Sequence, residues 1–130
     1  STGSAIRSGH QSPPGSGCSN LFLTASLKGR SYEEMLEMIE DGYIVNSVMG
    51  AHTANPTSGD FSVTTSSILR VEGGEVIGAV KQAGLSGNLA NALKDGVTLG
   101  DEVRPQGSYS SGSMYLPNVL LRNGLRVNPV

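Results

Sequence analysis

The amino-acid sequence predicts an α+β fold, in which two short helices pack on a mostly antiparallel β-sheet. Three observations carry this prediction. Runs rich in Val, Ile and Thr recur between turn residues, residues 31–43 repeat apolar side chains at helical spacing, and the turn Glu72-Gly73-Gly74-Glu75 joins two β-rich runs into a hairpin. A chain of 130 residues is long enough for one hydrophobic core, so we expect a single domain over residues 1–130.

Composition and charge limit the classes of function. The net charge is −2 and the Lys and Arg residues are scattered singly, which disfavours a nucleic-acid surface. No run of about 18 apolar residues is present, so no membrane span is expected. The single cysteine, Cys18, cannot form an internal disulfide, and no signal-peptide pattern opens the chain. We therefore expect a cytoplasmic protein, and the missing initiating Met leads us to read the chain as a fragment of a longer one.

The first third of the chain predicts a lead-in, a strand and a helix. Residues 1–19 are dominated by Ser, Gly and Pro, which is typical of an extended or loop-like segment. Residues 20–27 alternate apolar side chains and predict a strand. Ser31 is a good N-cap, and Glu34 completes a capping box with it. Gly42 is expected to end this helix.

The helix carries an apolar stripe formed by Tyr32, Leu36, Ile39 and Tyr43. The stripe is interpreted either as a partner-binding face or as simple packing on the sheet. Packing is favoured for an amphipathic helix this short.

The remaining segments alternate between strands and one further helix. Residues 43–49 predict a strand, and the turn-rich loop Asn55–Asp60 leads into the hairpin described above. A second helix is expected over residues 86–95, capped by Ser86-Gly87-Asn88 and ended by Gly96. The last predicted strands cover residues 114–116, 119–121 and 125–127, with Asn123-Gly124 as a hairpin turn between the final two.

The order of these segments resembles the C-terminal domain of the TldD/PmbA family, long called modulators of DNA gyrase and regarded as zinc metallopeptidases. Residues 57–62 resemble the family's Thr-x-Gly-Asp-aromatic-Ser loop, and residues 71–75 resemble its Val-Glu-Asn-Gly-Glu turn. Other similar segments keep the family's order along nearly the whole chain: Ser1-Thr2-Gly3, Ser31–Leu36, Gly42–Val45, Leu85–Leu89, Leu99–Asp101 and Leu116-Pro117.

The resemblance implies a heterodimeric protease that cleaves unfolded or leader-containing peptides. Zinc is expected in a TldD-like catalytic subunit, on a His-Glu-x-x-x-His helix outside this domain. His10 and His52 of this chain lie in loop-like stretches without ligand spacing, so both are interpreted as ordinary loop histidines. In TldD-like members a cysteine near the end of this domain resembles the third zinc ligand. PmbA-like members carry Cys-Gly-Ser next to the terminal strand, where this chain reads Ser111-Gly112-Ser113, and serine is a poor zinc donor. Cys18 lies at the wrong end of the chain to replace that cysteine. No metal ligand or cofactor is therefore expected here.

This departure favours the non-catalytic PmbA-type subunit, although the spacing of the hairpin suits TldD-like members as well. The implied assembly is a homodimer or a heterodimer with a TldD-like subunit, acting on unfolded peptide and not on nucleic acid.

Four residues of the loop are the candidates for a substrate groove: Gly59, Asp60, Phe61 and Ser62. Asp60 is interpreted either as a catalytic carboxylate or as a turn-stabilising acceptor, and the second reading is favoured. An open backbone edge on the hairpin from Phe61 to Val80 is the hypothesis for binding an extended peptide. Two alternative functions stay open beside the peptidase interpretation. One is a non-enzymatic scaffold that builds a dimer interface, and the other is a free-standing ligand-binding module.

Overall fold

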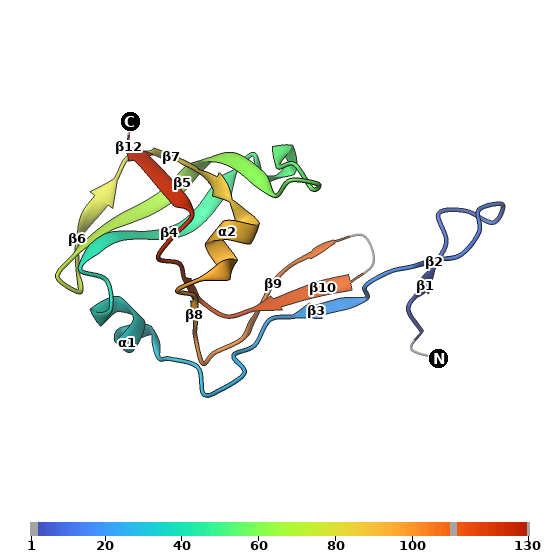
Figure 1. Ribbon diagram of the computed structural model, residues 1–130, viewed down its shortest axis with the longest axis horizontal. Helices are drawn as coiled ribbons and strands as arrows, with labels where there is room; N and C mark the ends of the chain where they lie inside the picture. The colour runs from blue at the N-terminus through green and yellow to red at the C-terminus, as the bar shows by residue number, and fades with distance from the viewer. Residues whose placement is uncertain (1–2, 110–111, 130) are drawn as a thin grey trace.

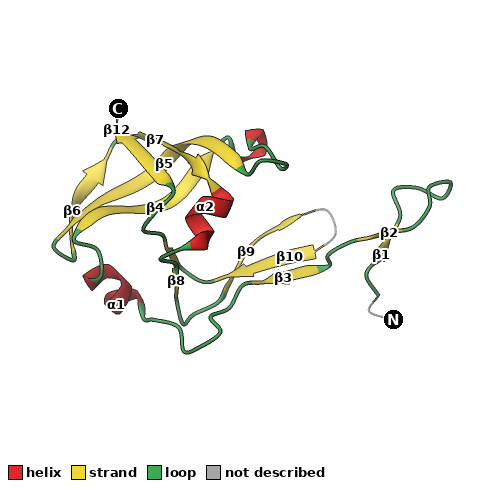
Figure 2. Ribbon diagram, in the orientation of Figure 1, coloured by secondary structure: helices red, strands yellow, loops and turns green. Residues whose placement is uncertain are grey.

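The computed structural model describes residues 3–109 and 112–129, and the chain forms a body and an arm (Figure 1). The body is built on a five-stranded sheet with the order β12-β7-β5-β4, in which β6 also pairs with β5. The arm is a three-stranded sheet with the order β3-β10-β9. Among the described strand pairs, all but that of β3 with β10 are antiparallel. The predicted α+β class, with a mostly antiparallel sheet and two short helices, is confirmed (Figure 2).

The strands of the body are β4 (Asp41–Met49), β5 (Asp60–Glu72), β6 (Glu75–Val80), β7 (Ala83–Asn88) and β12 (Leu125–Pro129). Those of the arm are β3 (Asn20–Phe22), β9 (Arg104–Tyr109) and β10 (Gly112–Leu116). Two small ladders pair β1 (Ala5–Ile6) with β2 (Gly15–Ser16), and β8 (Thr98–Leu99) with β11 (Val119–Leu120). The helices are α1 (Tyr32–Glu37), α2 (Leu89–Lys94) and the 3₁₀ turn η1 (Ala51–Thr53). Within the described residues, no helix is long and apolar enough to cross a membrane.

Strand β5 organises the body because it is paired along both edges. Most of its length pairs with β4 on one side. On the other side, residues 60–64 pair with β7 and residues 68–72 pair with β6. Thr65 lies where one partner strand gives way to the other, and its side chain is fully buried. Its hydroxyl donates to the carbonyl oxygen of Ala83 over 3.0 Å and accepts the Ala83 N–H over 2.9 Å, so the change of partner leaves neither backbone group unpaired.

The core of the body is small and follows the β5 pairing. The buried apolar side chains are Met35 of α1, Val63, Ile68 and Val71 of β5, Ala83 of β7 and Ala92 of α2. The strand β5 therefore stabilises the body mainly through its inward-facing side chains, as expected for a central strand.

Helix α1 begins as predicted and ends earlier. The Ser31 hydroxyl accepts the Glu34 N–H over 3.2 Å, and the Glu34 carboxylate accepts the Ser31 N–H over 2.8 Å, so the capping box is confirmed. The Ser31 N–H also lowers the pKa of Glu34. The prediction that Gly42 ends the helix is wrong, because α1 stops at Glu37 and Gly42 lies in β4.

The early end of α1 has a cause in the β5–β6 turn. The Gly73 N–H donates to the Glu40 carbonyl over 2.7 Å, and the Gly74 N–H donates to the Ile39 carbonyl over 2.8 Å. The carbonyl groups of Ile39 and Glu40 therefore accept hydrogen bonds from the turn, and α1 does not extend as far as these residues. Both glycines have positive φ, 58° and 80°, which explains why the turn is built from glycine.

Three of the predicted segments differ in the structure. The strand expected over residues 20–27 is shorter, since β3 ends at Phe22. The helix expected from Ser86 starts at Leu89, because residues 83–88 form β7 between β5 and β12. Asn123-Gly124 is not a hairpin turn, since β11 pairs with β8 and β12 pairs with β7. Gly124 instead approaches α2 so closely that a Cβ atom would lie 2.6 Å from the Ala92 nitrogen.

Candidate functional site

The loop Asn55–Asp60 is held in shape by its own hydrogen bonds. The Asn55 carboxamide oxygen accepts the backbone N–H groups of Thr57 and Ser58 over 2.9 and 3.2 Å. The Gly59 N–H donates to the Asn55 carbonyl, and the Asn55 N–H donates to the Asp60 carbonyl, each over 2.9 Å. Gly59 has a φ of 76°, a conformation that favours glycine. The loop is thus an ordered entrance to β5.

Asn88 fastens this loop to α2, and we call its three side-chain hydrogen bonds the Asn88 clasp. The Asn88 amide nitrogen donates to the Ser58 carbonyl and to the Asp60 carboxylate, each over 2.8 Å. Its amide oxygen accepts the Asn91 N–H over 3.1 Å and so caps the N-terminus of α2. The sequence prediction placed Asn88 in a helix cap but missed its contact with the loop, because that contact spans about thirty residues.

In the structure the Asp60 carboxylate accepts hydrogen bonds. The hydrogen bond from the Asn88 amide, followed by one from the Ser58 side chain, lowers the pKa of Asp60. A carboxylate stabilised in this way stays ionised at neutral pH and does not serve as a proton donor. The geometry supports the turn-stabilising reading of Asp60 over the catalytic one.

An apolar pocket of about 330 Å³ lies beside the clasped loop. Its walls come from the ends of β4, η1, the loop, β5, β7 and α2: Val48, Ala51, Ala54, Asn55, Pro56, Gly59, Phe61, Val63, Leu85 and Leu89. Of the four predicted site residues, Gly59 and Phe61 line this pocket and Asp60 braces its loop. Ser62 alternates with Phe61 along β5, so its side chain lies on the other face of the sheet.

The expected open edge of the hairpin is present on one strand alone. Phe61 and Ser62 of β5 pair with Gly87 and Ser86 of β7, so β5 offers no free edge on that side. Strand β6 pairs with β5 on one side and with no other described strand. Within the hairpin, β6 is therefore the strand that presents unpaired backbone groups.

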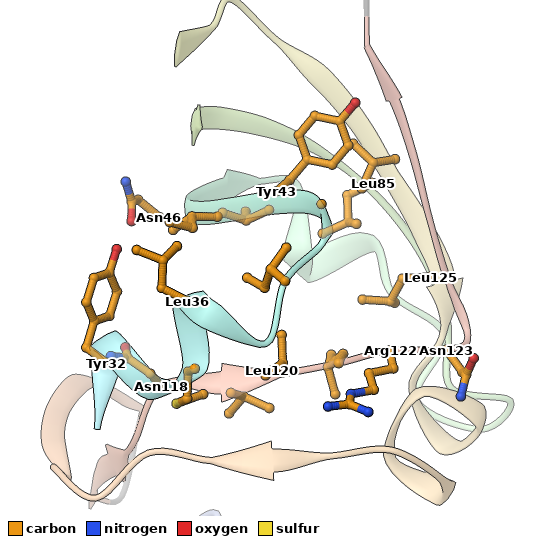
Figure 3. A pocket seen from close by; sticks show the side chains of 18 residues that line it. Tyr32, Leu36, Tyr43, Asn46, Leu85, Asn118, Leu120, Arg122, Asn123 and Leu125 are labelled. Carbon is orange, nitrogen blue, oxygen red and sulfur yellow. The ribbon is translucent and has the colours of Figure 1, made fainter. Parts of the chain in front are cut away.

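A larger cavity of about 430 Å³ separates α1 from the inner face of the sheet (Figure 3). Tyr32 and Leu36 approach it from α1, Leu85 from β7 and Leu125 from β12. The apolar stripe predicted on the helix thus faces the sheet, but this cavity lies between them, so the choice between packing and partner binding stays open. Tyr43 shares the cavity but belongs to β4.

An ion-pair cluster around Arg70 was not anticipated from the sequence. Its guanidinium contacts the carboxylates of Asp41 and Glu72 and lies 4.9 Å from the centre of the Tyr43 ring. The hydrogen bond with Asp41 is the main reason that the pKa of Arg70 is raised. Arg70 and Glu72 are neighbours on one face of β5, whereas the β4–β5 register brings Asp41 and Tyr43 to Arg70, and no local pattern reveals that second set of contacts.

The potential metal ligands of the sequence are dispersed. His10 lies in the lead-in and His52 in η1, both exposed. Cys18 is exposed, and its thiol donates to the Asn20 carbonyl over 3.2 Å. Among the described residues, no three His, Cys, Asp or Glu side chains gather in a geometry that could hold a metal ion. Ser111, the position that resembles the family cysteine, and Ser1-Thr2 lie outside the described residues.

Comparison with known proteins gives concordant results. Residues 1–126 match the model of the PmbA/TldA metallopeptidase C-terminal domain. Over 92 residues, 71% of this chain and 20% of the relative, the sequence is 30% identical to metalloprotease PmbA of Escherichia coli. An uncharacterized protein of Methanocaldococcus jannaschii is 29% identical over 121 residues, 93% of this chain and 27% of the relative.

Two solved structures have a similar fold. TldE from Thermococcus kodakarensis superposes with a TM-score of 0.76 and 25% identity, covering 98% of this chain and 28% of TldE. A putative modulator of a DNA gyrase from Thermotoga maritima gives a TM-score of 0.66 and 31% identity, covering 85% of this chain and 23% of that protein. The chain thus spans about a quarter of the length of these relatives.

Proposed function

The chain belongs to the PmbA/TldD metallopeptidase family as a C-terminal domain, and from this premise we propose that its parent protein is the PmbA-type, non-catalytic subunit of a peptidase. In this proposal a TldD-like sister subunit carries zinc and the general base. The domain described here shapes the substrate chamber and the contact between subunits. The substrates are unfolded or leader-containing peptides.

The observation that carries the proposal is the likeness to TldE, which extends over 98% of this chain. The identity with metalloprotease PmbA supports the same subunit type. The spacing of the hairpin suits both subunit types, so it does not contribute to this choice.

In this proposal the chain supplies no zinc ligand, which is supported by the dispersal of donor side chains among the described residues, where no three of them lie together. Zinc, when bound in the sister subunit, would activate the water that attacks the peptide bond. We assign no step through the metal to this chain. Its proposed contribution is binding and orientation of the peptide.

The proposed binding surface is the pocket beside the Asn88 clasp together with the open edge of β6. Pockets lined by apolar side chains accept apolar side chains of a ligand, and Phe61 and Leu89 are among the residues that line this pocket. Strand β6 would bind the backbone of an extended peptide by strand addition. Neither contact requires a particular peptide sequence, which suits an enzyme for unfolded substrates.

The test is a peptidase assay on the full parent protein, alone and mixed with a TldD-like subunit from the same source. A fluorescent unfolded peptide reports hydrolysis, and elemental analysis reports zinc. We expect neither hydrolysis nor stoichiometric zinc from the parent alone, and hydrolysis well above that of the sister subunit alone when both are mixed.

Hydrolysis by the parent protein alone would contradict the non-catalytic role. A mixed complex that forms but cleaves no better than the sister subunit alone would favour the scaffold alternative. Failure of the two proteins to associate would remove the proposed assembly altogether.

A further inference from the structure

The dipeptide Asn123-Gly124 joins β11 to β12 without forming a hairpin turn, since these strands pair with β8 and β7. The Asn123 side chain is exposed at the margin of the larger cavity (Figure 3). Among the described residues, neither the Asn123 carboxamide nor the Gly124 N–H forms a hydrogen bond. The side-chain carbonyl carbon of Asn123 and the backbone nitrogen of Gly124 are therefore both available for reaction.

An asparagine that precedes glycine can cyclise on the next backbone nitrogen. The Gly124 nitrogen gives its proton to a solvent base and bonds to the Asn123 Cγ, the Cγ–Nδ2 bond breaks, and Nδ2 takes up a proton and leaves as ammonia. Water then opens the five-membered succinimide ring at one of its two carbonyl groups and leaves aspartate or isoaspartate. Glycine favours the ring because it has no Cβ beside the attacking nitrogen. Water is the only other reactant that the two steps consume.

The other asparagines of the chain do not combine these features. Asn55 and Asn128 precede proline, whose nitrogen carries no proton. Asn88 uses its carboxamide in the clasp, and the Asn46 carboxamide donates to the Ser67 hydroxyl over 3.3 Å. Three more are followed by Leu, Ala or Val, whose side chains crowd the attacking nitrogen: Asn20, Asn91 and Asn118. Ring closure therefore meets the least hindrance at position 123.

Gly124 is packed too closely for the backbone to lengthen beside it. A Cβ atom on Gly124 would lie 2.6 Å from the Ala92 nitrogen, and a Cβ atom on Gly87 would lie 2.2 Å from the Gly124 carbonyl oxygen. That oxygen accepts the Asn88 N–H over 3.4 Å. Isoaspartate routes the backbone through the side-chain carbons of residue 123 and adds one C–C bond, about 1.5 Å. Gly124 then cannot keep both its contact with α2 and its place at the start of the β12–β7 ladder.

We propose that Asn123 is a modification site, where spontaneous cyclisation and hydrolysis convert asparagine to aspartate and isoaspartate, and that the isoaspartate form releases the start of β12 from β7. The atoms of Gly124 that pack against α2 and β7 are its Cα and carbonyl group, whereas the attacking nitrogen has no hydrogen bond to give up. The pocket beside the Asn88 clasp is affected as well, because Leu89 of α2 lines it.

The first test incubates the full parent protein at neutral and mildly alkaline pH, folded and in urea, and maps its peptides by mass spectrometry. Conversion changes the mass of the peptide that contains position 123 by the difference between an NH2 and an OH group. An endoprotease that cuts before aspartate but not before isoaspartate separates the two products. We expect both products in the folded protein, at a rate that rises with pH because the deprotonated amide attacks.

Two controls locate the reaction. Asn118 is exposed but precedes Val119, so it should stay intact over the same period. Asn123→Gln should stay intact because its longer side chain closes a six-membered ring far more slowly. An unmodified position 123 in the folded protein, whether or not urea permits the reaction, would overturn the proposal. Aspartate without isoaspartate would overturn it too, because the ring gives both.

The second test compares the isoaspartate form with freshly prepared Asn123→Asp, which carries the same added charge on a normal backbone. We expect faster hydrogen exchange at the Asn88 amide and at residues 125–127 in the isoaspartate form alone, while the amides of β5 keep their protection in both. Exchange as slow in the isoaspartate form as in the wild type would overturn the release of β12. Exchange equally fast in Asn123→Asp would overturn it as well, because charge would then be the cause.

Discussion

The body and the arm use similar strands in opposite ways. In the body, β5 is paired on both edges and buries Ile68 and Val71 almost completely. In the arm, β3 is paired on one edge and leaves Phe22 largely exposed. The body thus completes its own core, whereas the arm leaves an apolar edge uncovered. The difference predicts that truncations in the core of the body will cost more stability than truncations on the exposed face of the arm.

The largest effect is expected from the core of β5. Ile68→Ala removes a side chain that is 2% exposed, and such truncations cost about 2–5 kcal/mol of unfolding free energy. Ile77→Ala on the exposed face of β6 is the matched control and should change stability by less than about 0.5 kcal/mol. Chemical denaturation measures both, and similar losses at the two positions would contradict the burial described for the body.

The next effect concerns the change of partner strands at Thr65. Thr65→Val keeps the shape of the side chain but leaves the N–H and C=O of Ala83 without their buried partner, which costs about 1–3 kcal/mol. Thr65→Ser retains the hydroxyl and should lose less. If the Val variant is as stable as the wild type, the bridging role of Thr65 is wrong.

The Asn88 clasp should show a smaller effect. Asn88→Ala removes the cap of α2 together with both bonds to the loop, and cap removal costs roughly 0.5–2 kcal/mol. Hydrogen exchange should become faster at residues 58–60 and 89–91 while β5 beyond Thr65 is unaffected. Exchange that stays unchanged in the loop would show that Asn88 does not hold it.

The clasp also predicts a dependence on pH. The pKa of Asp60 is lowered in the folded protein, so its contribution to stability is present above its unfolded pKa of about 3.9 and is lost as the pH falls through the folded value. Asp60→Asn keeps an acceptor oxygen but cannot titrate. The wild type should therefore lose its advantage over this variant as the pH falls below about 4, as measured by thermal denaturation across pH. A constant difference in stability between the wild type and the variant across that pH range would exclude a contribution from the titration of Asp60.

The smallest change in stability is expected in the arm. Phe22→Ala removes a stacked ring from an exposed strand, which is worth about 0.5–1.5 kcal/mol. The unfolding free energy of the body, measured by chemical denaturation with a probe in β5, should change by close to zero. A large loss of body stability would mean that the arm is part of the same core.

The sequence predicted best where the determining contacts are local. The capping box of Ser31 and Glu34 and the turn at Gly73-Gly74 each depend on neighbouring residues, and both are confirmed. Strand β7 was missed because Ser86-Gly87-Asn88 suggests a helix cap, whereas the structure pairs these residues with β5 and β12. Gly87 is needed there because a Cβ atom would lie 2.2 Å from the Gly124 carbonyl oxygen. No single-sequence pattern contains that contact.

The candidate site was predicted in part for the same reason. Gly59 and Phe61 were identified through the loop they belong to, and both line the pocket. The Asn88 clasp and the Arg70 cluster depend on strand register, which brings together residues about thirty positions apart. The exposed apolar edge of β3 was read as an ordinary strand, because a sequence shows apolar character but not which side chains remain uncovered.

The most direct test of the difference between body and arm is hydrogen exchange at the backbone amides of this chain. We expect the Phe22 amide to exchange rapidly, because β3 ends its sheet among the described residues, and the amides of β5 to be protected, because β5 is paired along both edges. Protection of the Phe22 amide equal to that of the β5 amides would contradict the distinction between a self-contained body and an arm with an open edge.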